Sequence, residues 1–209
     1  MKDNQHIVTA FDDDLSELNT SLQNLGKMAI TQFELSIDAL ATQHQNTLDK
    51  IIKDDVNLDD LEAAIHEKAF EIIAVRSPLA QDLRHVLVAL KIATILERTG
   101  DYARNIANRT KVIATAGNEN IPGVNIGRMG QVTRDMLQDV MRAYATRDAD
   151  KALDVWRRDI EVDHMHTAFY KEVLASMSRD PNVVATGAHL LFIAKNIERI
   201  GDYATGIAE

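Results

Sequence analysis

Residues 97–108, "ERTGDYARNIAN", recur as "ERIGDYATGIAE" at residues 198–209, and eight of the twelve positions are identical. The copies begin at Glu97 and Glu198, so they lie 101 residues apart (198 − 97). A match of this length within one chain indicates an internal duplication. The chain is therefore predicted to consist of two homologous halves, each carrying one acidic helix that contains a glycine.

The helix before each copy repeats as well. Asp55 and Asp59 correspond to Asp159 and Asp163, with an offset of 104 residues (159 − 55). Helix-forming residues dominate, and no segment shows the two-residue alternation of a strand. Four of the nine glycines lie between residues 116 and 130, which marks the boundary between the halves. We expect six helices, at about residues 10–45, 47–75, 78–116, 122–147, 150–178 and 181–209.

These helices predict an all-α fold of two tandem antiparallel three-helix bundles related by pseudo-two-fold symmetry. The first bundle is expected in residues 1–117 and the second in residues 118–209. Ser77 and Asp180 each precede a proline and are predicted helix N-caps. Trp156 is expected to pack in the core between helices.

The composition limits the classes of partner. The formal net charge is −9, which argues against binding of duplex nucleic acid or of an anionic membrane surface. The chain has no cysteine, so disulfides, thiolate metal sites and a cysteine nucleophile are excluded. No apolar run is long enough to span a bilayer, and the N-terminus lacks the pattern of a signal peptide. The sequence predicts a soluble protein of the cytoplasm.

The acidic residues of the repeated helix form a stripe beside the apolar face. At 100° per residue, Asp101 lies about 40° from Glu97, and the second copy behaves in the same way. If consecutive helices pack antiparallel, the aspartates of the preceding helix face this stripe. Four carboxylates then line one helix–helix boundary in each half. We name these the first seam (Asp55, Asp59, Glu97 and Asp101) and the second seam (Asp159, Asp163, Glu198 and Asp202).

Two interpretations of the seams stay open at this point. In the first, the carboxylates lie on a solvated face, with Arg98 and Arg199 paired locally to Asp101 and Asp202. In the second, a cation neutralises carboxylates that would otherwise repel one another. Three features favour the cation: the duplication, the absence of a facing Lys or Arg on the Asp55 and Asp159 stripes, and the mid-helix glycine of both copies. A glycine there indicates close approach by a neighbouring helix. Oxygen-rich ligands predict Mg²⁺, Mn²⁺, Ca²⁺, iron or zinc.

The two repeated motifs, together with "RSPLAQDLRHVLVALKIATILER" at residues 76–98, resemble the PhoU family, accessory regulators of the phosphate-specific transport system. The resemblance covers essentially the whole chain. It implies that the E-x-x-x-D helices belong to two three-helix bundles and that iron or zinc clusters are associated with them. By position, the metal ligands would be Glu97, Asp101, Glu198 and Asp202, faced by Asp55, Asp59, Asp159 and Asp163.

Some positions depart from the family pattern. The second half lacks the D-L-R sequence that starts the third helix, His166 replaces the counterpart of Glu62, and Gly206 replaces that of Asn105. The two sites are therefore expected to differ in affinity or in metal. Family members usually continue the last helix, so the resemblance implies a chain truncated after Glu209.

By resemblance, the protein is a non-enzymatic regulator acting between a phosphate ABC transporter and a sensor histidine kinase. It would damp the phosphate-starvation response, reach the membrane only through protein partners and form a homodimer. Two alternatives stay open: a di-metal enzyme built on a helical bundle, and an inert helical adaptor without metal. A catalytic metal would need an open coordination position and a nearby acid–base group.

Overall fold

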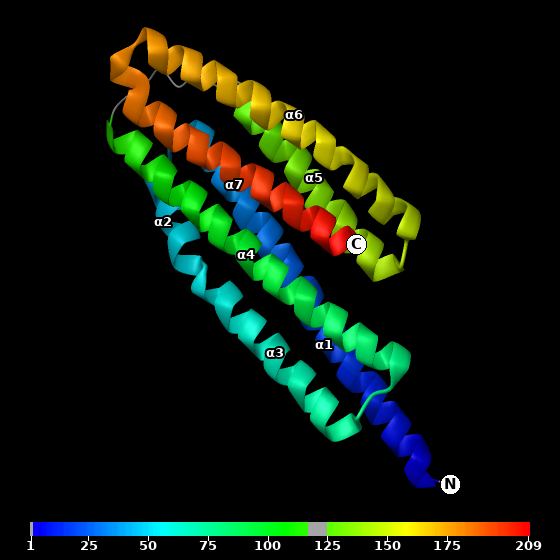
Figure 1. Cartoon of the computed structure of the whole chain (residues 1–209). Coiled ribbons are helices and arrows are strands. Elements are labelled where there is room, and N and C mark those ends of the chain that lie inside the picture. Colours follow the sequence, from blue (N-terminus) through cyan, green and yellow to red (C-terminus); the bar gives the residue numbers. More distant parts are fainter. Residues whose placement is uncertain (1, 117–124) are drawn as a thin grey trace.

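A computed structural model describes residues 2–116 and 125–209, which are almost entirely helical (Figure 1). The elements are α1 (Lys2–Thr42), α2 (Gln45–Asp54), α3 (Val56–Arg76), α4 (Ala80–Ala116), α5 (Asn125–Thr146), α6 (Ala149–Arg179), the 3-10 helix η1 (Pro181–Val183) and α7 (Val184–Ala208). The described residues contain no strand, so the prediction of an all-α fold is confirmed. None of the described helices combines the length and the apolar content needed to cross a membrane.

The second expected helix is divided into α2 and α3 at Asp55. The division coincides with a side chain that enters the helical hydrogen-bond ladder. Gln32 of α1 donates its amide N–H to the carbonyl oxygen of Ile51 at 3.1 Å, and that oxygen would otherwise accept the N–H of Asp55. This break was not predictable from the residues of the second helix, because the side chain that enters the ladder lies on another helix.

The two predicted caps have different outcomes. Asp180 accepts a hydrogen bond from the backbone N–H of Asn182 at 2.9 Å and precedes a proline at the start of η1, so this N-cap is confirmed. The prediction for Ser77 was wrong. Ser77 instead ends α3 in the left-handed conformation, with φ of 48°, and its N–H bonds to the carbonyl of Ile73 at 3.2 Å.

Two of the four glycines in the expected boundary region lie in a described helix. Residues 117–124, which include the expected boundary at 117/118 and the expected helix start at Pro122, lie outside the described residues. Gly127 and Gly130 belong to α5. A Cβ at Gly130 would lie 2.8 Å from the side chain of Ile37, so this glycine permits close packing of α5 on α1.

The two halves are related by a pseudo-two-fold axis. In the first half α1, α3 and α4 pack together, and in the second half α5, α6 and α7 do the same. Tyr102 and Tyr203, which are equivalent at the offset of 101, meet with ring centroids 5.7 Å apart where α4 crosses α7. Arg109 stacks over Phe192 at 4.0 Å, which shows that the two helices run antiparallel. The paired three-helix bundles are therefore confirmed.

One hydrophobic core extends through both halves. Its buried members include Phe33 of α1, Leu96 of α4, Leu137 of α5 and Ile197 of α7. Four helices, α1, α4, α5 and α7, thus form the centre, while α3 and α6 lie at opposite edges (Figure 1). The expectation for Trp156 was wrong: its side chain is on the outward face of α6 and is 51% exposed.

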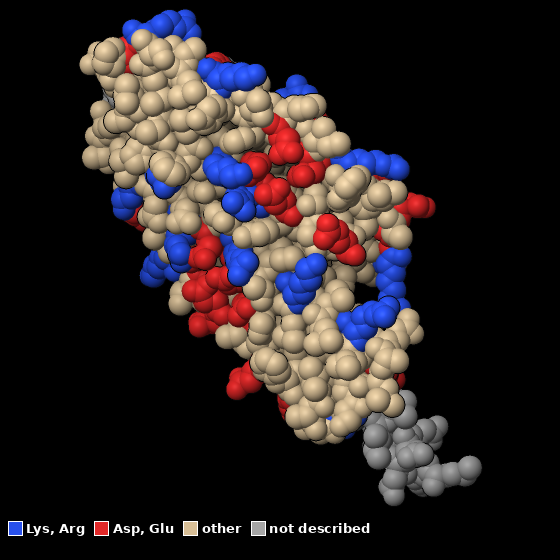
Figure 2. All heavy atoms as spheres, in the orientation of Figure 1, with Lys and Arg blue, Asp and Glu red and all other residues tan. Residues whose placement is uncertain are grey.

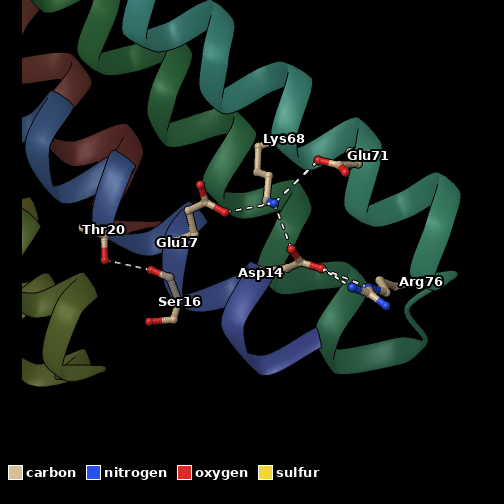
Figure 3. Close-up of polar contacts among 7 residues, drawn as sticks. All are labelled: Asp14, Ser16, Glu17, Thr20, Lys68, Glu71 and Arg76. Carbon is tan, nitrogen blue, oxygen red and sulfur yellow. Dashed lines mark hydrogen bonds and ion pairs between the residues drawn. The ribbon is translucent and has the colours of Figure 1, made fainter. Parts of the chain in front are cut away.

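An ion-pair network fixes α3 against α1 (Figure 3). Asp14 of α1 accepts hydrogen bonds from Lys68 at 2.8 Å and from Nε of Arg76 at 3.0 Å, both on α3. Lys68 also contacts Glu17 at 2.9 Å and Glu71 at 3.6 Å. The hydrogen bond from Lys68 outweighs the cost of burial and holds the pKa of Asp14 below its ordinary value.

Replacing Asp14 by Asn is expected to reduce the free energy of unfolding by about 1 kcal/mol at neutral pH. Because the folded pKa of Asp14 is lowered, this contribution is present above the ordinary Asp pKa and is lost as pH falls through the folded value. Urea unfolding at neutral and acidic pH measures both effects. Asp13→Asn, at an exposed position, is the control, and an equal loss there would contradict the assignment.

Candidate functional site

The first seam is formed by α3 and α4, with Asp55 at the break before α3. Asp55 is 3% exposed, whereas Asp59 is on the surface. The guanidinium of Arg104 forms an ion pair with Asp55 and a second one with Asp101 at 2.6 Å. Arg104 therefore supplies a cation between the two helices. The sequence analysis missed Arg104 and described the Asp55 stripe as lacking a facing Arg or Lys. Arg104 nevertheless lies within the repeated stretch, residues 97–108.

A glycine and a glutamine complete the first seam. A Cβ at Gly100 would lie 2.6 Å from the Leu58 side chain, which confirms that the mid-helix glycine permits close approach of the facing helix. Gln32 of α1 donates to Oδ1 of Asp55 at 3.1 Å, while its own Oε1 is buried and has no hydrogen-bond partner among the described residues. Gln32 was not identified from the sequence, since α1 carries no part of the repeated motif.

Burial shifts the protonation of the first seam. Loss of hydration, followed by repulsion from Asp101 and Asp59, raises the pKa of Glu97 to about 7. The pKa of Asp55 is also raised, because burial outweighs the attraction of Arg104. At neutral pH the first seam therefore holds Glu97 close to half-protonated, next to a carboxylate pair bridged by arginine.

The predicted acidic stripe of the first half continues into a polar triad. Glu62 contacts Nε2 of His66 at 3.0 Å and accepts a hydrogen bond from the hydroxyl of Thr94 at 3.2 Å. His66 and Thr94 are themselves 3.2 Å apart. The triad joins α3 to α4 one turn beyond Glu97 and leaves these groups hydrogen-bonded to one another.

The second seam lies between α6 and α7, and its carboxylates have fewer cation and hydrogen-bond partners than those of the first seam. Glu198 is paired with Lys195 at 2.6 Å. Oδ1 of Asp159 is buried and has no hydrogen-bond partner among the described residues. Burial, then repulsion from Asp163, Asp202 and Glu198, raises the pKa of Asp159 to about 6. The pKa of Asp202 is raised as well, first by burial and then by Glu198.

The difference between the seams follows from two substitutions within the duplication. At the offset of 101, the counterpart of Arg104 is Thr205, whose hydroxyl donates to the backbone carbonyl of Asp202 at 2.7 Å. Before the last helix of each half the offset is 104, so the counterpart of Gln32 is Met136, an apolar side chain buried in the core. The second seam thus lacks both the cation and the amide donor that serve Asp55.

The local ion pairs of the solvated-face interpretation do not form. Arg98 and Arg199 make no salt bridge with Asp101 or Asp202 in the described ranges 2–116 and 125–209. Figure 2 shows the acidic side chains in two patches on one face of the molecule, one along α3 and α4 and the other along α6 and α7. The seams are therefore surface-accessible at their outer edges and buried at their inner ones.

The residues present fit a metal differently in the two seams. Within the described ranges, no three Asp, Glu or His side chains are gathered at metal-binding distance. In the first seam, Arg104 occupies the position between Asp55 and Asp101 and would compete with a cation. In the second seam, Lys195 pairs with Glu198, while the buried Oδ1 of Asp159 has no hydrogen-bond partner among the described residues. The unpaired aspartate oxygen makes the second seam the better fit to a cation, since Arg104 already bridges two carboxylates in the first.

Replacing Glu97 by Gln is expected to stabilise the chain at alkaline pH and to change little at acidic pH. Because the pKa of Glu97 is raised in the folded chain, its contribution to the free energy of unfolding is fully present below the ordinary Glu pKa. This contribution is lost as pH rises through about 7. The melting temperature should rise by about 2–4 °C at alkaline pH, since 1 kcal/mol has that effect in a chain of this size. Glu67→Gln, at an exposed position on α3, is the control; a pH-independent change in E97Q would contradict the argument.

Three comparisons with known proteins agree with this architecture. The PhoU domain model matches residues 22–110 and 126–209. A phosphate-specific transport system accessory protein PhoU homolog of Caulobacter vibrioides is 40% identical over 98% of this chain and 89% of the relative, and the PhoU of Escherichia coli K12 is 34% identical over 99% and 85%. Crystal structures of PhoU from Pseudomonas aeruginosa and Streptococcus pneumoniae superpose with TM-scores of 0.92 and 0.87, at 28% identity and at least 93% coverage of each chain. The chain belongs to the PhoU family.

Proposed function

We propose that the protein is a non-enzymatic regulator of phosphate uptake and acts as an accessory protein of a phosphate ABC transporter. The observation that carries this proposal is the full-length similarity to relatives that are named phosphate-specific transport system accessory proteins. The proposed place of action is the cytoplasm, at the inner side of the transporter. The acidic surface favours recruitment through proteins, since anionic lipid would repel it.

The proposed regulation is negative. When phosphate is plentiful, the protein would act with the transporter to restrain a sensor histidine kinase and its response regulator. We further propose that it works as a homodimer. The negative charge of the surface would oppose self-association unless cations bridge the copies, so light scattering with and without divalent metal addresses the dimer, and a monomer in both conditions contradicts it.

A deletion strain of the native host tests the function. Transcription of phosphate-starvation genes is expected to stay high in phosphate-rich medium after deletion and to return to the low level when the wild-type chain is restored. Co-purification from the restored strain should recover subunits of the transporter and the sensor kinase. Low transcription in the deletion strain would contradict negative regulation, and recovery of neither partner would contradict the accessory role.

The second seam is proposed to hold a divalent or trivalent metal ion, with iron or zinc as the leading candidates. Its ligands would be drawn from Asp159, Asp163, Glu198 and Asp202. The support is the excess of partly buried negative charge, together with an Asp159 oxygen that has no hydrogen-bond partner among the described residues. A bound cation would supply the counter-charge that Arg104 supplies in the first seam, so the proposed role is structural: it would tie α6 to α7.

Exchanging the residues at the equivalent positions tests the metal. The wild type is expected to bind one ion per chain and to lose thermal stability in chelator, by about 2.7 kcal/mol when the metal is present at a hundred times its dissociation constant. Thr205→Arg should abolish binding, because the guanidinium replaces the ion. Arg104→Thr should open the first seam and add a second ion. Elemental analysis and melting curves measure both effects.

The control is Thr205→Lys or Thr205→Ser, which separates the effect of charge from that of side-chain size. T205K should weaken binding as T205R does, whereas T205S should bind as the wild type does. Equal metal content in all variants, or a melting temperature that does not respond to chelator, would contradict the metal site and leave the regulatory proposal standing.

A further inference from the structure

The outer faces of α3 and α6 expose large apolar side chains at equivalent positions. Val56 and Ile160 are 54% and 57% exposed, and Phe70 and Leu174 are 60% and 40% exposed. Both pairs are separated by 104 residues, which is the offset between Asp55 and Asp159. Exposed apolar residues that lie singly on a surface need no explanation, but the same exposure in both copies of a duplicated helix does.

These residues belong to a stripe with the spacing i, i+3, i+7, i+10 and i+14. Such spacing keeps five side chains on one side of a helix and is the pattern by which one helix packs along another. We call the stripes the outer strips. The α3 strip consists of Val56, Asp59, Ala63, His66 and Phe70, and the α6 strip consists of Ile160, Asp163, Thr167, Tyr170 and Leu174.

In the described part of the chain the large apolar side chains of the outer strips stay exposed, while His66 of the α3 strip reaches Thr94 of α4 at 3.2 Å. The inner side of α3 contacts α1 and α4, and the inner side of α6 contacts α5 and α7. The two strips therefore lie along opposite edges of the molecule, with α4 and α7 between them (Figure 1). On α6 the apolar stripe extends further toward the start of the helix through Leu153 and Trp156, which are 45% and 51% exposed.

Each strip also carries one exposed carboxylate three residues after its first member: Asp59 in the α3 strip and Asp163 in the α6 strip. These two residues also belong to the first and second seams, so each strip borders its seam. A second copy of the chain placed on a strip would bring these carboxylates and the seams against their own equivalents, and like charges would repel. An anionic membrane would be repelled for the same reason. The apolar positions combined with acidic ones instead complement a helix that is apolar on one face and basic along one edge.

We propose that each outer strip is a docking site for an amphipathic helix of a partner protein. The apolar face of that helix packs on Val56 and Phe70, or on Ile160 and Leu174, and its Lys or Arg side chains reach Asp59 or Asp163. Because the strips are related by the pseudo-two-fold axis, one molecule offers two equivalent sites and suits a partner that presents this helix twice.

Trp156 gives a direct probe, since it is the only tryptophan of the chain and extends the α6 strip. The ligand in the test is a synthetic 18-residue helical peptide with Leu on one face and Lys along one edge. The expected result is a saturable blue shift of Trp156 emission that weakens with added salt. A matched peptide with Glu in place of Lys is expected to give no shift.

Variants of the full chain assign the shift to the strip. Replacing both Ile160 and Leu174 by Ser should weaken peptide binding by about tenfold or more. Asp163→Asn should weaken it several-fold and reduce the salt dependence. Val112→Ser removes an apolar side chain of α4 that is 50% exposed and lies outside both strips, so it should bind as the wild type does.

The α3 strip is tested by moving the probe. Phe70 belongs to the α3 strip and is 60% exposed, so a chain with Trp156→Phe and Phe70→Trp reports on the first half. The same Lys-containing peptide should shift its emission as well. A shift in one half alone would overturn the claim of two equivalent sites.

Three results would overturn the docking proposal as a whole. They are the absence of a shift with the Lys peptide, an equal shift with the Glu peptide, and an unchanged affinity in the Ile160 and Leu174 double variant. A shift that depends on protein concentration alone would identify a second copy as the occupant. A shift with phosphatidylglycerol vesicles that exceeds that with the Lys peptide would identify a membrane surface instead.

Discussion

A carboxylate that lies beside a hydrophobic core loses hydration, and the loss must be offset by a cation, a hydrogen bond or a proton. This constraint governs both seams of the structure. In the first seam Arg104 bridges Asp55 and Asp101, and Gln32 donates to Asp55. In the second seam neither contact has a counterpart, and burial followed by repulsion from Asp163 raises the pKa of Asp159 to about 6.

The two halves therefore share the carboxylates of the seams but differ in the groups that neutralise these carboxylates. A Cβ at Gly100 would lie 2.6 Å from the Leu58 side chain. A Cβ at Gly201 would instead be in ordinary van der Waals contact, 3.4 Å from Asp159 and 3.5 Å from Val162, so close packing requires the glycine in the first half only. The tyrosines at the crossing of α4 and α7 are retained, and they hold the halves in register. The substitutions at the positions of Arg104 and Gln32 remove the two side chains that contact Asp55 in the first half, which is where a difference in bound ion would arise.

Much of the fold was predictable because its signals are local. The repeated stretch predicted the two bundles, and the four-residue spacing of Glu97 and Asp101 predicted a stripe at the edge of the core. Long-range contacts were not predictable: Gln32 reaches Asp55 from another helix and breaks the second helix there. Trp156 was misplaced because an aromatic residue at helical spacing is expected to face inward, and only the packing of α6 decides which face is covered.

The central claim is that the two seams differ in how their charge is compensated. Anomalous X-ray diffraction from crystals grown with iron or zinc tests it most directly, because it locates the ion without assumptions about ligands. The account predicts one peak per chain between α6 and α7, close to Asp159, and none beside Arg104. A peak in the first seam with Arg104 displaced, or no peak in the second seam, would contradict it.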